Sequence, residues 1–212
     1  MDLKGKKVLV FGAGKSGIGA ADLLGSAGAQ PVIYDGNADL DKEAVLHKTN
    51  GKYTPEIWAG DFPERALDSL DLVVLSPGVP TDLPLVKSFY EKGLPVWSEV
   101  ELAYRTGKGE VLAITGTNGK TTTTALTGQI VGAWAKKTFV VGNIGNSYTK
   151  EVLNSDEDSY TVAEISSFQL ETVHKFAPKV SAVLNITPDH LNRHHTMECY
   201  EQTKEMIAAN QT

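Results

Sequence analysis

The segment ITGTNGKTTTT, residues 114–124, places two glycines, a lysine and a threonine at a spacing that can hold phosphate groups. Gly116, Gly119, Lys120 and Thr121 spell GxxGKT between an apolar run and a stretch that can open a helix. In such a loop the backbone N–H groups surround phosphates, the lysine reaches the β and γ phosphates and the threonine hydroxyl binds Mg²⁺. The spacing is shorter than the common GxxxxGK[ST], whose first glycine would fall at Ile114. We therefore expect ATP as the ligand; a threonine-rich loop that only caps a helix is the alternative.

The residues expected to bind ATP form one unbroken run in this loop. They are Gly116, Thr117, Asn118, Gly119, Lys120, Thr121, Thr122 and Thr123.

Two further residues follow predicted strands later in the chain. Glu164 ends the apolar run YTVA, and His190 follows VSAVLNI in the segment NITPDHLNRHH. Both would project from the carboxyl edge of a parallel sheet, where ligands bind. Taken singly, Glu164 is more simply a cap or a surface group, and His194 and His195 are expected to be solvated. Beside a phosphate-binding loop, however, a bound Mg²⁺ needs one or two carboxylates besides the hydroxyl.

A second glycine loop lies near the start of the chain. GAGKSG, residues 12–17, follows the strand-like run KVLVF, and Asp35 stands 23 residues after Gly12. Gly12, Gly14 and Gly17 fit the dinucleotide-binding pattern, in which an acidic residue holds a ribose. The physical basis of the pattern is more general, because small residues let any phosphate or sugar approach a helix N-terminus. NAD, a different nucleotide-like ligand and a structural tight turn all remain open from these residues.

Composition restricts the class of protein. The chain has 212 residues, 41% of them hydrophobic, and a formal net charge of −6. This acidic balance argues against a nucleic-acid partner, which favours a concentrated basic face. Cys199 is the single cysteine, so no internal disulfide can form and a cytoplasmic location is expected. No segment approaches the roughly 18 apolar residues that a membrane-spanning helix requires, so no membrane insertion is expected.

The order of apolar runs predicts an α/β fold. Short β-branched runs alternate with helical patterns, which is typical of a parallel sheet covered by helices on both faces. Strands are expected near residues 7–11, 31–34, 72–75, 96–97, 111–115, 139–141, 160–163 and 180–185, and helices near 18–27, 83–92, 99–104 and 197–209. The glycines of RTGKGE, residues 105–110, indicate a linker, so the domains are expected to be 1–107 and 108–212. The chain ends in a helix with no further strand, which predicts a fragment of a larger protein.

Four segments and one later lysine together resemble the Mur ligase family. They are GTNGKTT at 116–122, GNIG at 142–145, EISSFQLE at 164–171, NITPDHLNRH at 185–194 and the later Lys204. SPGVP at 76–80, WSEVEL at 97–102 and SSFQLE resemble the branch of that family that adds D-glutamate. The resemblance covers all 212 residues. It implies a Rossmann-like N-terminal domain, then the first part of a P-loop ATPase-like central domain whose remainder, with a third domain, lies outside this chain.

The resemblance also implies a ligand for the first glycine loop. In this family the N-terminal domain holds the uridine diphosphate part of the substrate and not NAD. The residues that it implies as contacts are Lys15, Ser16, Asp35, Gly36, Gly78 and Asn143. Gly36 and Asn37 stand where relatives offer hydroxyl or basic side chains, so the uracil contacts depart from the family pattern.

The reaction implied by the resemblance joins a carboxylate to an amine at the expense of ATP. UDP-N-acetylmuramoyl-L-alanine and D-glutamate would be the substrates, and an acyl phosphate would give the amine a good leaving group. Lys120 and Mg²⁺ would supply positive charge for the approach of two anions. The resemblance implies that Thr121 and Glu164 hold one magnesium ion, and that His190 and Lys204 hold a second. For the latter role Lys204 would be carbamylated, because a protonated ammonium binds no metal.

Two other functions remain open at this point. An NAD-binding oxidoreductase would explain the first glycine loop but not the second, and a non-catalytic nucleotide-binding module would explain both. The 212-residue chain by itself is not expected to form the amide, and it is expected to be a monomer. Asn192 stands where many Mur ligases carry Asp, which implies a supporting role that tolerates loss of the charge.

Overall fold

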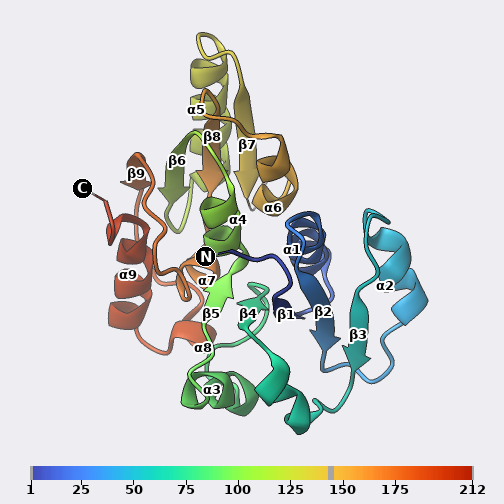
Figure 1. The fold of residues 1–212 in the computed structure, drawn as a ribbon. Coiled ribbons are helices and arrows are strands. Elements are labelled where there is room, and N and C mark those ends of the chain that lie inside the picture. Colours follow the sequence, from blue (N-terminus) through green and yellow to red (C-terminus); the bar gives the residue numbers. More distant parts are fainter. Residues whose placement is uncertain (1, 143–145, 212) are drawn as a thin grey trace.

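The computed structural model describes residues 2–142 and 146–211, which form two parallel sheets in succession along the chain (Figure 1). The first sheet has the strand order β3-β2-β1-β4-β5. Its elements in chain order are β1 (Lys7–Phe11), α1 (Lys15–Ser26), β2 (Gln30–Asp35), α2 (Lys42–Lys48), β3 (Glu56–Ala59), the 3₁₀ helix η1 (Glu64–Ser69), β4 (Leu72–Leu75), α3 (Pro84–Glu91), β5 (Val96–Ser98) and α4 (Glu99–Thr106).

The second sheet has the strand order β7-β8-β6-β9 and is also parallel. Its elements are β6 (Glu110–Thr115), α5 (Lys120–Gly132), β7 (Thr138–Gly142), α6 (Tyr148–Glu151), η2 (Val152–Asn154), β8 (Tyr160–Glu164), α7 (Ser167–Leu170), β9 (Val180–Val183), α8 (Leu191–His194), α9 (Met197–Glu205) and η3 (Met206–Ala208). The predicted α/β class with parallel sheets is confirmed.

The strand β1 shows why this sheet needs helices on both faces. Its side chains alternate in direction, and all of Val8, Leu9, Val10 and Phe11 are buried. Val8 and Val10 pack into a cluster with α1 and α4, whereas Leu9 and Phe11 pack into a second cluster with α3. An unbroken apolar run is therefore the expected pattern for this strand.

The first of these clusters continues from one sheet into the other. It contains Val100 and Leu102 of α4, Val111 and Ala113 of β6, and Ala163 of β8. Helix α4 lies between the two sheets (Figure 1). The two halves of the chain thus share a hydrophobic core.

A buried carboxylate on α4 strengthens this junction. Glu101 has no exposed surface, and its side chain accepts hydrogen bonds from the backbone N–H groups of His174, Lys175 and Phe176 at 2.9–3.1 Å. Arg105 Nε also donates to it, one turn further along the helix. Hydrogen bonds to an ionised group are stronger than neutral ones, so this contact fixes α4 to the segment between α7 and β9.

The segment expected to be a linker is close-packed. A Cβ atom added to Gly107 would lie 2.5 Å from Cγ2 of Val152. Gly109 has a φ of 81°, and its added Cβ would lie 2.2 Å from the carbonyl oxygen of Ser159. Both glycines are thus required by close approach between α4, β6 and the η2–β8 turn. The division of the chain into domains at residue 107 stays a prediction.

Three elements of the first half were missed from the sequence, and one of them, the 3₁₀ helix η1, buries no residue. The edge strand β3 is short and half-buried, and α2 buries only Val45, so neither has a strong apolar pattern. The expected strand at 180–185 ends at Val183, and the expected helix at 197–209 is divided into α9 and η3. Within residues 2–142 and 146–211, no helix has both the length and the apolar character needed to cross a membrane.

Candidate active site

A cleft of about 630 Å³ opens at the carboxyl edge of the first sheet. Strands β1 and β4 are neighbours there, with Phe11 paired to Leu75, although the chain leaves β1 towards β2 on the other side. The loops after these two strands therefore diverge, as at the ligand-binding crevice of other open parallel sheets. The cleft is lined by residues of both loops and by the end of β2, including the predicted Lys15, Ser16, Asp35, Gly36 and Gly78. Asn143 lies outside the described residues.

The carboxylate of Asp35 supports the glycine loop beside it. One of its oxygens accepts a hydrogen bond from the Ala13 N–H at 3.0 Å, and the other accepts from the Asn37 N–H at 3.0 Å. Gly12 has a φ of 107°, and an added Cβ on Gly17 would lie 1.8 Å from the Gly12 carbonyl oxygen. These glycines are thus explained by the tight turn, which is common to many phosphate-binding loops and does not specify nicotinamide.

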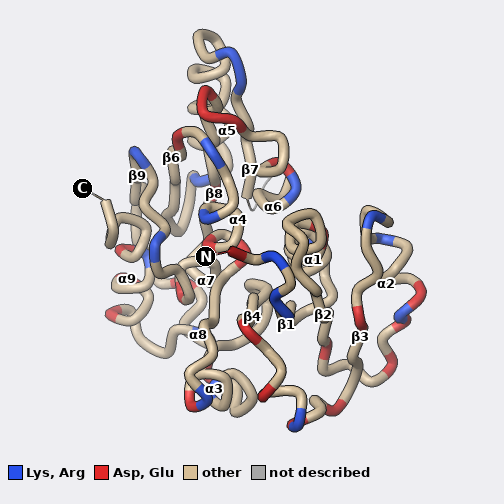
Figure 2. Tube along the Cα trace, viewed as in Figure 1, with Lys and Arg blue, Asp and Glu red and all other residues tan. Residues whose placement is uncertain are grey.

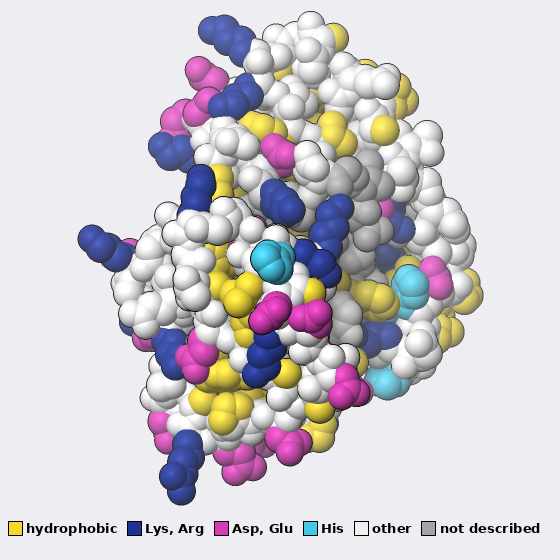
Figure 3. Space-filling model, turned by 90° about the vertical axis from the view of Figure 1, so that its right-hand side faces the viewer, with side chains coloured by type: hydrophobic (Ala, Val, Ile, Leu, Met, Phe, Trp, Pro, Cys, Tyr) yellow, Lys and Arg dark blue, Asp and Glu magenta, His cyan; other side chains and the backbone are white. Residues whose placement is uncertain are grey.

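Three lysines surround a smaller cavity next to this cleft. Lys15, Lys48 and Lys150 line a space of about 360 Å³ that shares Gly14 with the cleft. Along the whole chain, acidic and basic residues are interspersed (Figure 2). On one face of the molecule, however, several Lys and Arg side chains gather near the centre (Figure 3). The combination of cleft and lysines suits a ligand that carries negative charge.

The second glycine loop joins β6 to α5. Gly116 and Gly119 have φ values of 153° and 82°, which favour glycine, and Gly119 lies directly before the first helical residue. The ammonium group of Lys120 donates to the carbonyl oxygens of Gly116 and Thr117, both at 2.9 Å. Lys120 is thus folded over its own loop, within reach of any phosphate that enters it.

The adjacent strand supplies the acidic partner of the loop. Glu164 pairs with Ile114 in the register between β8 and β6, so it ends its strand beside the start of the loop. The hydroxyl of Thr121 donates to Oε2 of Glu164 at 2.9 Å. The structure therefore brings together the predicted hydroxyl and carboxylate.

The segment after β9 holds the loop from the other side. The Thr117 N–H donates to the Asn185 carbonyl at 2.9 Å, and the Asn118 N–H donates to Asn185 Oδ1 at 2.9 Å. The side-chain amide of Asn185 returns a bond to the Asn118 carbonyl at 3.0 Å. Asn185 is not among the site residues predicted from the sequence. Its position directly after a strand and before the expected His190 was the available signal.

Lys204 is buried beneath the same loop. Its side chain is 1% exposed, and its ammonium group donates to the Gly116 carbonyl at 2.9 Å and to Thr115 Oγ1 at 3.4 Å. Burial lowers the pKa of Lys204 to about 8, the charge of Lys120 acts in the same direction, and Asp189 opposes them. A neutral amine is thus more accessible here than on an exposed lysine.

His190 lies at the rim of the site in an unusual backbone conformation. Its φ is 53°, its ring lies 4.9 Å from that of Phe168, and its Nε2 is 3.5 Å from an Asp189 carboxylate oxygen. The expectation of a solvated His194 is wrong, because this residue is 3% exposed and its Nε2 lies 2.9 Å from Ser167 Oγ. Burial lowers the pKa of His194 to about 4, so the ring is neutral at pH 7. The burial arises from packing against α7, which the local sequence does not show.

The donor set fits a phosphate-bound Mg²⁺ better than a metal held by protein alone. Among residues 2–142 and 146–211, no group of three or more His, Cys, Asp and Glu side chains could hold a metal ion. The Thr121 hydroxyl and the Glu164 carboxylate are hard oxygen donors, and Mg²⁺ commonly takes one or two such ligands with phosphate oxygens and water. A second metal ion on His190 and Lys204 stays a prediction.

Comparisons with known proteins match both halves of the chain to one family. The profile of the Mur ligase MurD-like N-terminal domain matches residues 6–98, and that of the Mur ligase middle domain matches residues 114–212. The chain is 65% identical over its whole length to a protein of Lachnospira eligens named UDP-N-acetylmuramoylalanine--D-glutamate ligase, and 56% identical to a protein of the same name from Lachnoclostridium phytofermentans. It covers 47% of each, so it spans about half the length of these curated relatives. The oxidoreductase alternative finds no support in these matches.

A solved structure shows the same fold. The UDP-N-acetylmuramate:L-alanyl-gamma-D-glutamyl-meso-diaminopimelate ligase from Neisseria meningitides aligns with a TM-score of 0.62 over 98% of this chain and 69% of its own, at 18% identity. This similarity concerns the fold alone. Together, the two domain profiles and the relatives that match this chain over its whole length show that the chain belongs to the Mur ligase family.

Proposed function

We propose that this chain acts in the ATP-dependent joining of D-glutamate to UDP-N-acetylmuramoyl-L-alanine, a step of peptidoglycan precursor synthesis. The observation that carries the proposal is the presence, in one chain, of the cleft between the loops after β1 and β4 and of the loop whose Thr121 hydroxyl contacts Glu164. The names of the whole-length relatives support the choice of substrates. We place the reaction in the cytoplasm, in keeping with the free Cys199.

In this proposal the first cleft holds the uridine diphosphate part of the substrate. Lys15 and Ser16 begin α1 and line the cleft, where the helix N-terminus favours phosphate. Gly36 and Gly78 leave room for the ligand, since no atom lies closer than 3.9 Å to an added Cβ at either position. The neighbouring lysines add positive charge for the diphosphate.

The second loop holds ATP in this proposal. Lys120 would exchange the Gly116 and Thr117 carbonyls for the β and γ phosphates, which are stronger acceptors. Thr121 and Glu164 would hold Mg²⁺, which supplies positive charge next to the phosphates when bound. The substrate carboxylate then attacks the γ-phosphate, ADP leaves, and the acyl phosphate reacts with the amine of D-glutamate to give the amide and phosphate.

Lys204 is the proposed site of a carbamate. Its neutral amine would add to carbon dioxide and release a proton, which converts a cation into an anionic oxygen donor. Burial favours the neutral amine, in agreement with a pKa of about 8. This change would also remove a positive charge from beneath the loop that must admit Mg²⁺.

Calorimetric titration of the 212-residue chain tests the nucleotide site. Heat is expected with UDP-N-acetylmuramoyl-L-alanine and none with NAD. Binding of NAD alone would return the first loop to the dehydrogenases and overturn the proposal.

A second titration tests the phosphate site with Mg²⁺ and a non-hydrolysable ATP analogue. Lys120→Met is expected to weaken binding by about 10-fold to 100-fold, because a charge-assisted hydrogen bond contributes roughly 1.5–3 kcal/mol. The matched variant Lys87→Met, at an exposed position of α3, is expected to bind as the wild type does. Equal affinities of all three chains would show that the loop does not hold the phosphates.

A further inference from the structure

The segment that carries His190 has an unusual backbone at both ends. His190 and His195 have φ values of 53° and 66°, and they are the non-glycine residues with positive φ in the described part of the chain. Such conformations persist only where surrounding contacts determine them, and they concentrate at functional sites. The contacts that hold this segment are therefore of interest.

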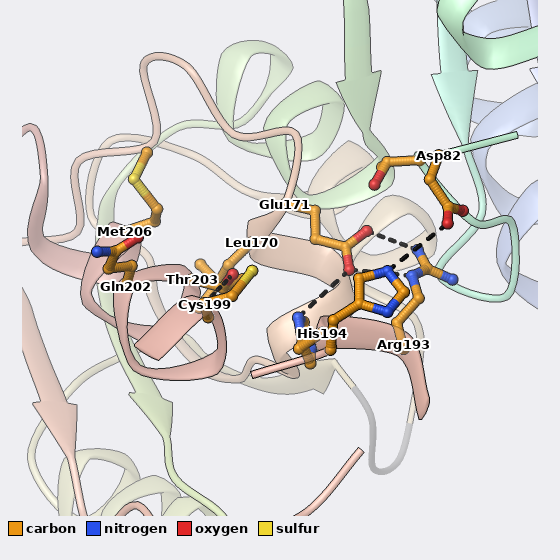
Figure 4. A pocket seen from close by; sticks show the side chains of 11 residues that line it. Asp82, Leu170, Glu171, Arg193, His194, Cys199, Gln202, Thr203 and Met206 are labelled. Carbon is orange, nitrogen blue, oxygen red and sulfur yellow. Dashed lines mark hydrogen bonds and ion pairs between the residues drawn. The ribbon is translucent and has the colours of Figure 1, made fainter. Parts of the chain in front are cut away.

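Arg193 makes the principal side-chain contacts of this segment. Its guanidinium donates two hydrogen bonds to Glu171, from Nε to Oε1 at 3.1 Å and from Nη2 to Oε2 at 2.5 Å. The two side chains point towards each other at the edge of a cavity of about 370 Å³ (Figure 4). They are 13% and 10% exposed, so this two-point ion pair is largely shielded from water.

The same guanidinium reaches the first half of the chain. Nη2 of Arg193 donates to the carbonyl oxygen of Val79 at 2.8 Å. Val79 belongs to the loop after β4, and it lines the nucleotide cleft. The guanidinium also lies 5.0 Å from the ring of Phe168, which is itself 4.9 Å from the ring of His190. One side chain thus touches both the loop of the nucleotide cleft and the ring that supports His190.

A second side-chain contact joins the segment of residues 190–195 to the residues after β4, and it is more exposed. His195 lies 3.7 Å from a carboxylate oxygen of Asp82, but the side chains are 68% and 59% exposed. An exposed pair at this distance contributes little, because water screens it. This contact offers a matched control for Arg193.

We propose that Arg193 is a positioning residue that couples the nucleotide cleft to the phosphate site. The inference rests on the proposed function, since it needs a ligand in each site. A ligand in the cleft restricts the loop of residues 76–80, and Arg193 passes this restriction to the segment of residues 190–195. The second ligand then loses less conformational freedom on binding, which appears as positive cooperativity.

The test is the affinity for UDP-N-acetylmuramoyl-L-alanine, measured calorimetrically with and without saturating Mg²⁺ and a non-hydrolysable ATP analogue. For the wild-type chain the nucleotide analogue is expected to tighten binding at least fivefold, the lower end of typical coupling between sites. In Arg193→Lys the charge remains but the two-point geometry is lost, so the factor is expected to fall below twofold. His195→Gln is expected to retain the wild-type factor.

Hydrogen exchange gives a second readout that a purely structural role would not change. The Val79 N–H donates to the Ser76 carbonyl at 2.9 Å within the cleft loop. Its exchange is expected to slow when the ATP analogue binds to the wild type, and to stay unchanged in a folded Arg193→Lys chain. This measurement also tests the coupling through Arg193 if Arg193→Lys lowers the stability of the chain.

The outcomes separate the two proposals. Binding of both ligands with equal coupling in the wild type and in Arg193→Lys would overturn the role of Arg193 and leave the proposed function standing. No binding of either ligand by the wild type would overturn both.

Discussion

Two buried glutamates on the first turn of α4 should respond to substitution in opposite directions. Glu99 is 3% exposed, its Oε1 accepts a hydrogen bond from Gln169 Nε2 at 3.0 Å, and its Oε2 has no hydrogen-bond partner among the described residues. Burial raises the pKa of Glu99 to about 7, against 4.5 ordinarily. Glu101, by contrast, accepts from three backbone N–H groups and from Arg105.

The magnitude for Glu99 follows from the shift in its pKa. Between pH 4.5 and 7 the folded chain keeps the proton of Glu99 while the unfolded chain has released it, so the free energy of unfolding falls as pH rises. A shift of about 2.5 units corresponds to about 3 kcal/mol, at roughly 1.4 kcal/mol per unit. This loss is complete above about pH 7.

Glu99→Gln removes the titration and keeps the shape of the protonated acid. The variant and the wild type are therefore expected to have similar stability at pH 4.5, and the variant is expected to be more stable by about 3 kcal/mol at pH 8. Chemical denaturation at a series of pH values measures the difference. If the difference in free energy of unfolding between the variant and the wild type stayed constant between pH 4.5 and 8, ionisation of the buried Glu99 would not destabilise the fold and the reasoning would be refuted.

The neighbouring residue provides the contrast. Glu101→Gln is expected to lower the free energy of unfolding at pH 8 by about 2 kcal/mol or more, because an amide has one acceptor oxygen instead of two and leaves some of these donors unsatisfied. If both substitutions stabilised the chain, the hydrogen-bond partners of each carboxylate would not be what determines the effect of its substitution on stability.

Three further predictions concern Gly17, Lys204 and Asn192. Gly17→Ala is expected to lower the free energy of unfolding by about 1–3 kcal/mol, because its Cβ would lie 1.8 Å from the Gly12 carbonyl oxygen. Gly14→Ala is the control and is expected to cause no such loss, since no atom lies within 4 Å of its Cβ. Denaturation curves compare the two variants, and equal losses would contradict the packing argument. With ¹³C-labelled carbon dioxide, the NMR signal of a carbamate on Lys204 is expected to grow as pH rises from 7 to 9, because the fraction of neutral amine increases through a pKa of about 8. If the Lys204→Met variant kept this signal, the carbamate would lie on another residue. Asn192 is exposed, so Asn192→Asp is expected to change the affinity for the ATP analogue less than twofold, and a larger change would give that side chain a direct role.

The sequence predicted those features that depend on local spacing. The loop of residues 116–121 and the loop of residues 12–17 could be placed because each follows an apolar strand and opens a helix. The parallel sheets then brought Glu164 to Thr121, as expected from strand ends that share one edge. Asn185 was missed as a contact of the loop, although its segment had been singled out.

Other features depend on contacts between distant parts of the chain. The bond from Arg193 to Val79 joins residues 114 positions apart, and neither residue belongs to a pattern that indicates the other. His194 was expected in solvent, yet Ser167 and Phe168 of α7 pack against it. Burial of a polar side chain is decided by which helix packs on it, and the local pattern does not contain that information.

The packing at Gly107 and Gly109 also bears on how the two sites can move. Neither glycine leaves room for a Cβ atom beside Val152 or Ser159, so the backbone of this segment packs closely on the η2–β8 turn. With the hydrophobic core continuous across α4, the two sheets are expected to behave as one rigid body on the timescale of ligand binding. The nucleotide cleft would then close towards the phosphate site by movement of the loops at the sheet edges. Rotation of one half of the chain relative to the other would not be needed.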